Sequence, residues 1–194
     1  MRRRTFDLIT SSVGILLVVL LLVAGGLLMW AYSFTNNQVT TQLTEQQITF
    51  PAAGSAALKA LPASDAAAMS QYAGQQMTTG TQAETYANHF IAVHLTEIGG
   101  GKTYSQLSAE ALAQPNNAKL QAQVDTVFRG NTLRGLLLNA YAFWQIGQIA
   151  LWAAIASFIG AFIFLVLSVL GFLHMRRTPE EADLVHPKSP VPAR

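Results

Sequence analysis

Two long apolar stretches near the two ends of the chain enclose a longer polar segment. The first stretch, residues 13–34, contains no charged side chain. At about 1.5 Å per residue, a helix of this length spans roughly 33 Å and can cross a hydrocarbon core of about 30 Å. The pattern therefore predicts a transmembrane helix at residues 13–34, preceded by a short N-terminal segment at residues 1–12.

The second apolar stretch is longer than one membrane crossing requires, because no charged side chain occurs between Arg134 and His174. Strongly polar side chains lie in its first half, and its aromatic residues suit the boundary with the lipid headgroups. We therefore place the second transmembrane helix at residues 149–173 and an interfacial segment at residues 141–148.

Basic residues close to the apolar stretches predict the orientation of the chain. They lie before the first stretch and after the second, and such clusters favour the cytoplasmic side. Both termini are therefore expected in the cytoplasm, residues 35–140 outside it, and residues 174–194 in a disordered cytoplasmic tail. The basic residues are Arg2, Arg3, Arg4, Arg176 and Arg177.

Charge and cysteine content exclude several classes of function. The segment 35–140 has five Lys and Arg against six Asp and Glu, so the isoelectric point near 9.1 comes from the tails. This distribution argues against nucleic-acid binding and favours contact between the tails and anionic lipid. The chain has no cysteine, which excludes disulfides and thiolate metal sites.

A cleaved signal peptide is the alternative interpretation of the N-terminus. The basic start and the small residues Ala24, Gly25 and Gly26 fit such a peptide. The apolar run continues beyond them to Trp30, however, and its length is closer to that of a membrane span. We expect the segment to be retained as a transmembrane helix.

The polar segment predicts a set of short helices. Thr81 followed by Glu84 is a capping-box pattern, and Gly99 is expected to form a left-handed C-cap, which predicts a helix over residues 82–98. Further helices are expected at residues 52–61, 65–73, 104–113 and 117–129, the last closed by Gly130 and followed by a helix that Asn131 caps. Residues 39–50 are expected to form an extended stalk or linker.

These elements predict an all-α membrane protein in which two transmembrane helices flank a small helical extracytoplasmic domain. Small residues recur every four positions in the second predicted span, and such spacing lets helices approach closely. They predict association either with the first span or with another subunit, although alanine is also simply common in this chain. The helix-packing residues are Ala153, Ser157, Ala161, Ala156 and Gly160.

Two local motifs resemble ligand sites and fail on spacing. Gly101-Lys102-Thr103 resembles the end of a phosphate-binding loop, but Thr96 stands where the first glycine should be. His89 and His94 are five residues apart, which on a helix turns them about 140° away from each other. We therefore expect no metal or cofactor. His94 with Glu97, and the amides near the outer end of the second span, are kept as candidate interaction or ligand residues: His94, Glu97, Gln145 and Gln148.

Catalytic motifs are equally lacking in the sequence. No Gly-x-Ser-x-Gly elbow or Ser-x-x-Lys arrangement occurs, and residues 35–140 contain no local carboxylate pair. The pattern therefore predicts a protein that is not an enzyme.

Four segments resemble a family of small two-span actinobacterial membrane proteins of uncharacterised function. Its members often carry the label of aromatic ring-opening dioxygenase. A non-haem iron site needs two histidines and a carboxylate that converge on one metal, and His89 and His94 are predicted to diverge. The segments are QLTEQQITFP (42–51), YAGQQMTTGTQAETYANHFIAVHL (72–95), GGKTYSQLS (100–108) and FRGNTLRGLLLNAYAF (128–143).

Two functional hypotheses follow. The first is a non-enzymatic accessory or scaffold subunit of the cell envelope, located in the plasma membrane, whose partners are the lipid bilayer and another membrane protein or a second copy of itself. The alternative is a ligand-sensing or transport-associated module in which the long helices pass a movement across the membrane. An enzyme that acts on an envelope lipid or glycan is a third option.

Overall fold

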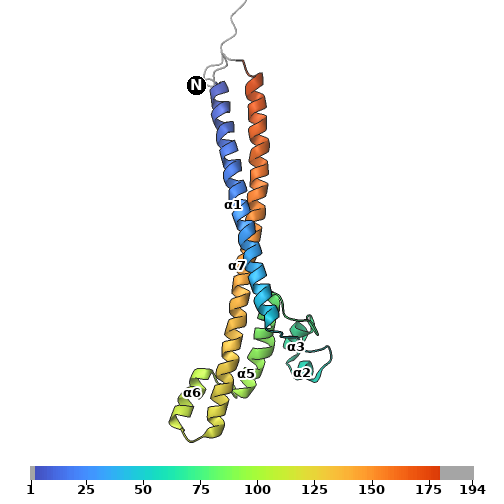
Figure 1. Cartoon of the computed structure of the whole chain (residues 1–194), viewed down its shortest axis with the longest axis vertical. Coiled ribbons are helices and arrows are strands. Elements are labelled where there is room, and N and C mark those ends of the chain that lie inside the picture. The colour runs from blue at the N-terminus through green and yellow to red at the C-terminus, as the bar shows by residue number, and fades with distance from the viewer. Residues whose placement is uncertain (1–2, 180–194) are drawn as a thin grey trace, which may run out of the picture. The chain divides into compact units, whose positions relative to one another are not determined.

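The computed structural model describes residues 3–179, and in this range the protein is all-helical without a β-strand. Two helices, α1 (Arg3–Glu45) and α7 (Ala118–Arg177), are long and apolar enough to cross a membrane (Figure 1). The expectation of an all-α chain with two such helices is therefore confirmed. The predicted tail lies mostly outside the described residues, as do Met1 and Arg2, although residues 174–177 still belong to α7.

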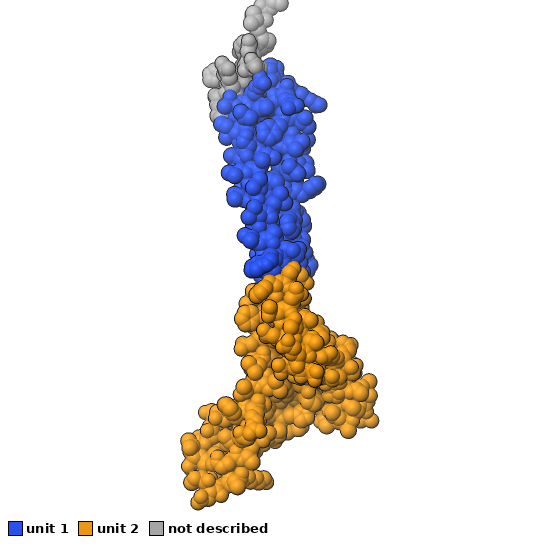
Figure 2. Space-filling view, in the orientation of Figure 1, with its two compact units in different colours: residues 1–31, 149–194 blue, residues 32–148 orange. Residues whose placement is uncertain are grey.

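The chain forms two compact units (Figure 2). One contains residues 1–31 and 149–194 and is called the helix pair. The other contains residues 32–148 and is called the lobe. The boundary between Gln148 and Ile149 lies where the sequence places the start of the second span. Where a membrane begins stays a prediction.

Small residues hold α1 and α7 together in the helix pair. A Cβ added to Gly171 would meet Ser11, and one added to Gly14 would meet Ser168, so the two helices run antiparallel in close contact. The buried contact positions are spaced by three, four or seven residues, as in the seven-residue repeat of a coiled helix pair. Buried contact residues of this seam are Ser11, Gly14, Val18 and Gly25 on α1, with Ala150, Ala154, Ala161 and Ser168 on α7.

The lobe contains the short helices α2 (Ala56–Lys59), α3 (Ala63–Ser70), α4 (Gly80–Tyr86), α5 (Ala92–Ile98) and α6 (Tyr104–Ala113). A π-helical segment, η1 (Ala87–Ile91), joins α4 to α5. Phe50, Met69 and Met77 are almost fully buried at the centre of the larger core. A second, smaller core holds α6 against α7 through Leu107, Ala111, Leu120 and Val127.

The expected stalk at residues 39–50 is wrong for its first half. α1 continues as a helix to Glu45 because Val39 and Leu43, one turn apart, are buried in the larger core. The extended part is confined to residues 48–50, where Thr49 forms an isolated antiparallel bridge with Gln76. Tertiary burial of one helical face therefore outweighs the weak local pattern.

The predicted break at Gly130 is also wrong, since α7 runs without interruption from Ala118 to Arg177. Gly130 lies inside the helix, where a Cβ would overlap the side chain of Leu95. The glycine thus permits a close approach between α5 and α7 instead of ending a helix. Asn117 caps the start of α7, with its Oδ1 accepting a hydrogen bond from the Leu120 amide at 3.1 Å.

The helix predicted at residues 82–98 has different caps in the structure from those that the sequence predicted. The capping box is formed by Thr79 and Gln82, two residues before the predicted Thr81 and Glu84. Gly99 has a right-handed φ of −73°, and the left-handed conformations belong to Gly100 and Gly101, with φ of 59° and 78°. The helix expected at 104–113 has those bounds in the structure, whereas the one expected at 52–61 shortens to α2.

Candidate functional site

The two histidines of the lobe have separate partners. His89 Nδ1 lies 2.7 Å from Asp65 Oδ1, so this histidine ties η1 to α3. His94 Nδ1 lies 2.8 Å from the carbonyl oxygen of Phe90, to which it donates, and its ring packs on Phe90 at 4.5 Å between centroids. In residues 3–179 the structure contains no group of three side chains placed to hold a metal ion.

The other two candidate ligand residues, Gln145 and Gln148, lie on α7, where Gln145 is exposed and Gln148 is half-buried. Neither lines the groove described below, and Glu97 lies exposed on α5. The structure therefore does not bring the four candidate residues into one site.

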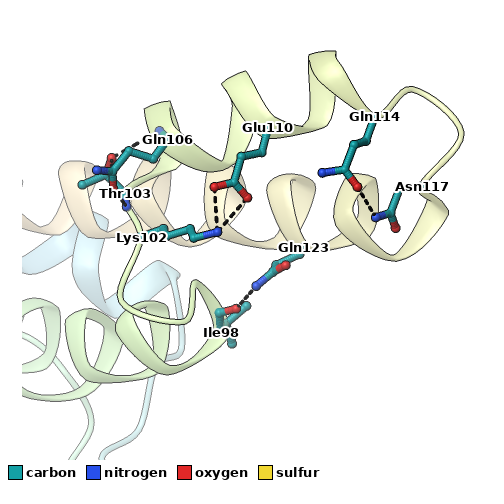
Figure 3. A network of polar contacts seen from close by, with 8 residues as sticks. All are labelled: Ile98, Lys102, Thr103, Gln106, Glu110, Gln114, Asn117 and Gln123. Atoms are coloured by element: carbon teal, nitrogen blue, oxygen red, sulfur yellow. Dashed lines mark hydrogen bonds and ion pairs between the residues drawn. The ribbon is translucent and has the colours of Figure 1, made fainter.

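We call α6 and the start of α7 the arm of the lobe. Its polar network includes Lys102, the lysine of the Gly101-Lys102-Thr103 motif (Figure 3). Lys102 Nζ contacts both carboxylate oxygens of Glu110, at 2.6 and 2.7 Å. Thr103 and Gln106 form a capping box at the start of α6, and the Gln123 amide donates to the carbonyl oxygen of Ile98. Lys102 thus fastens the turn that precedes α6 to that helix.

Exposed apolar side chains lie on the same arm. Leu112 is 81% exposed and Phe128 is 52% exposed. Tyr104, also exposed, packs on Phe128 with 5.5 Å between ring centroids. We call Tyr104, Leu112 and Phe128 the arm apolar residues.

A groove of about 520 Å³ lies in the lobe between the end of α1 and the middle of α7. Val39, Leu43 and Leu137 line it and are buried, so they form its floor. The helical continuation of α1 beyond Phe34 and of α7 before Ile149 places these residues opposite one another. The groove is therefore a product of the two continuous helices that the sequence analysis had divided.

The two walls of this groove differ in chemistry. On one side Gln38, Gln42 and Gln46 recur every four residues and are exposed. The other side is largely apolar, with Leu136 and Phe143 each 61% exposed, and its one polar side chain among the described lining residues of α7 is the exposed Asn139. Leu133 and Ala140 complete the apolar wall, and among the described residues those that line the groove carry no charge.

Sequence reasoning missed this groove because it treated residues 39–50 as extended. The four-residue spacing of Gln38, Gln42 and Gln46 was the available signal, since such spacing places side chains on one helical face. On the facing wall of α7, only Phe143 falls in the predicted interfacial segment 141–148, and the other wall residues were assigned to the extracytoplasmic domain.

The helix-packing residues predicted in the second span differ in their burial and in their contact with α1. Ala161 is buried in the seam, and Gly160 approaches Leu21 of α1, where a Cβ would lie 3.3 Å from the leucine Cδ1. Ala153 and Ser157 are half-buried, with Ser157 Oγ donating to the Ala153 carbonyl at 2.9 Å. Ala156 is exposed, whereas Ala154, which the prediction omitted, is fully buried.

The seam ends in a polar cluster near the start of α1. Asp7 Oδ2 lies 3.8 Å from His174 Nε2 of α7. A small pocket of about 260 Å³ adjoins Asp7 and includes Ser11 and Ser168 in its lining. This end of the pair is therefore more polar than its middle.

Comparison of the chain with protein-family models, with curated proteins and with solved structures gives no match.

Proposed function

We propose that the chain is a non-enzymatic integral membrane protein of the cell envelope, an accessory or scaffold subunit that acts through protein–protein contacts. In this proposal α1 and α7 cross the plasma membrane at residues 13–34 and 149–173. Both termini are cytoplasmic, and residues 35–140 are extracytoplasmic. The length and apolar character of the two helices and the basic residues beside them support this topology.

The observation that carries the proposal is the exposure of Leu112, at 81%, together with the other arm apolar residues. Phe128 precedes Gln148 on the same continuous helix by about 20 residues, which corresponds to roughly 30 Å. Lipid of a membrane that begins at Ile149 does not reach that far. A protein surface is then the natural cover for these side chains.

The test is purification of the tagged full-length protein from its own membranes in mild detergent, with mass spectrometry of the proteins that travel with it. We expect a reproducible partner that is lost in Leu112→Glu and retained in Ala113→Glu. Ala113 is the adjacent exposed residue and provides the matched control. A monomer without a partner, or equal recovery of the partner with both variants, would contradict the proposal.

A ligand-sensing or transport-associated module is the second candidate, favoured by the continuity of α1 and α7 with the groove. A ligand between the two helices would act directly on segments continuous with the predicted spans. This candidate predicts that occupation of the groove changes the rate at which cysteines placed in the seam cross-link. An unchanged rate would speak against it.

A further inference from the structure

The groove between α1 and α7 combines an apolar floor, a largely apolar wall that includes Asn139, and a wall of glutamine carboxamides. We propose that it binds one acyl chain of a neutral membrane lipid whose head group carries free hydroxyls, such as a diacylglycerol. In this proposal the acyl chain lies against Leu136, Ala140 and Phe143, and the head group forms hydrogen bonds with the side-chain amides of Gln38 and Gln42. This inference does not depend on the protein partner proposed above.

The size and shape of the groove suit a small amphiphile. Its volume of about 520 Å³ falls within the range of about 300–1,000 Å³ that is typical of small-molecule sites. The floor residues Val39, Leu43 and Leu137 are buried in the lobe and provide a preformed surface. Exposed Leu136 and Phe143 lose water contact when a chain lies against them, which favours binding.

The lining selects the charge of the head group. A carboxamide both donates and accepts hydrogen bonds, so a row of glutamines matches hydroxyl and ester groups. Among the described residues no cation lines the groove, and a phosphate or carboxylate there would lack a counter-charge. The guanidinium of Arg134 is directed elsewhere, with hydrogen bonds to the Ala87 carbonyl at 3.2 Å and to Asn88 Oδ1 at 2.8 Å. A neutral head group therefore fits best.

The position of the groove along the helices identifies the bilayer as the source of the ligand. Phe34, the last residue of the first predicted span, is exposed and lines the groove. Thr35 faces Gly147 of α7, where an added Cβ would lie 3.5 Å from the threonine Cβ. Beyond this level α1 becomes polar, whereas the exposed apolar wall of α7 continues to Leu133, about 14 residues or roughly 21 Å further. A lipid tail that lies along α7 can thus extend from the membrane into the groove.

The experiment uses the full-length protein in phosphatidylcholine nanodiscs that contain a diacylglycerol with a photoreactive acyl chain. Cross-linked peptides are identified by mass spectrometry. Ala140→Trp fills the groove, and Ala142→Trp places the same side chain on an exposed position of the same helix that does not line the groove. Labelling of the predicted spans serves as the internal control for access of the probe.

We expect labelling within residues 34–46 and 133–143. Ala140→Trp should reduce this labelling about tenfold or more, because the indole occupies the groove and excludes the acyl chain. Ala142→Trp should label as the unaltered protein does. Labelling confined to the spans, or equal labelling in the two variants, would overturn the proposal. A dimer that Ala140→Trp dissociates, with no lipid label in the groove peptides, would assign the groove to a second copy of the chain.

A second pair of variants tests the head group without filling the groove. The unaltered protein should label more strongly with diacylglycerol than with its hydroxyl-acetylated analogue. Gln42→Leu should abolish this preference, while Gln145→Leu, an exposed glutamine outside the groove, should keep it. A preference that survives Gln42→Leu would overturn the assignment of the glutamine wall. Loss of the arm partner in Leu112→Glu and loss of lipid labelling in Ala140→Trp are separate readouts, so the two proposals fail independently.

Discussion

Gly80, the first residue of α4, packs directly against the side chain of Trp144 on α7, and a Cβ at position 80 would overlap the tryptophan. Trp144 in turn stacks with Tyr141 at 6.2 Å between ring centroids and packs on the larger core. The start of α4 is thereby held against α7 within the lobe. This contact requires a residue without a side chain at position 80.

Gly80→Ala should therefore destabilise the lobe by about 1–3 kcal/mol, the usual cost of overpacking. Gly135→Ala is the matched control, because an added Cβ there has nothing within 4 Å and the residue lies inside helix α7. Alanine at 135 should be neutral or stabilise by up to about 1 kcal/mol. Hydrogen exchange of residues 80–98 in the full-length protein measures both effects. Equal protection in the two variants would contradict the contact.

The pairing of α1 with α7 predicts that a disulfide can be engineered between the two helices, in a chain that has no cysteine of its own. A Cβ at Gly171 would lie 3.5 Å from the Cβ of Ser11, at the near end of the range of about 3.5–4.5 Å found in disulfides. The double variant Ser11→Cys, Gly171→Cys should therefore oxidise within one chain, detected as a shift in gel mobility without a doubling of mass. Ser12→Cys with Gly171→Cys should not, because Ser12 is exposed and about 100° away around the helix. Cross-linking of both pairs alike, or only between chains, would refute this packing.

The capping box at the start of α4 distinguishes Thr79 from Thr81. Thr79 accepts a hydrogen bond from the Gln82 amide at 3.3 Å, and Gln82 Oε1 accepts one from the Thr79 amide at 3.0 Å. Thr79→Ala should cost about 1 kcal/mol of stability, as for other N-cap residues. Thr81→Ala should cost less, since Thr81 lies within the first turn. Thermal unfolding of the two variants compares them, and a larger loss for Thr81→Ala would restore the sequence-based assignment.

Ionisation of the Tyr86 hydroxyl is expected to lower the free energy of unfolding at alkaline pH. Burial raises the pKa of Tyr86 above its usual value of 10.0, and the ring packs between Phe50 and Phe90, at 5.4 and 4.9 Å. As the pH rises through about 10, the unfolded chain releases this proton before the folded one does, so the free energy of unfolding falls with pH until the raised pKa is reached.

Urea unfolding as a function of pH measures this dependence. Tyr86→Phe removes the titrating group and should flatten the curve above about pH 10. An identical slope in Tyr86→Phe and the unaltered protein would show that another group is responsible.

Much of the secondary structure could be predicted from the sequence. The two long apolar helices follow from uninterrupted apolar runs, and the helix expected at residues 104–113 has the bounds of α6. The wrong predictions concern residues, such as glycines, whose local pattern suits either a helix end or a position inside a helix. Gly130 and Gly99 both resemble helix stops, yet Gly130 lies inside α7 against Leu95. The π-helical segment Ala87–Ile91 had no recognised local signal.

The candidate site was less accessible than the fold. Gln38, Gln42 and Gln46 share a face only because α1 remains helical to Glu45, and Val39 and Leu43 are buried only because Phe50, Leu61 and Met77 supply a core for them. The sequence of a single segment does not show whether its weakly apolar face will be buried against such a core. The row of glutamines therefore has no meaning until the tertiary contacts are known.

The sequence by itself determined the apolar helices, the distribution of charge and the lack of cysteine chemistry, because each depends on which residues occur and in what local order. The tertiary structure decided the continuity of α1 and α7, the seam that joins Ser11 to Gly171, and the groove between Gln42 and Ala140. These features depend on residues far apart in the chain, whose burial against one another outweighs the small local preferences of a glycine or a threonine.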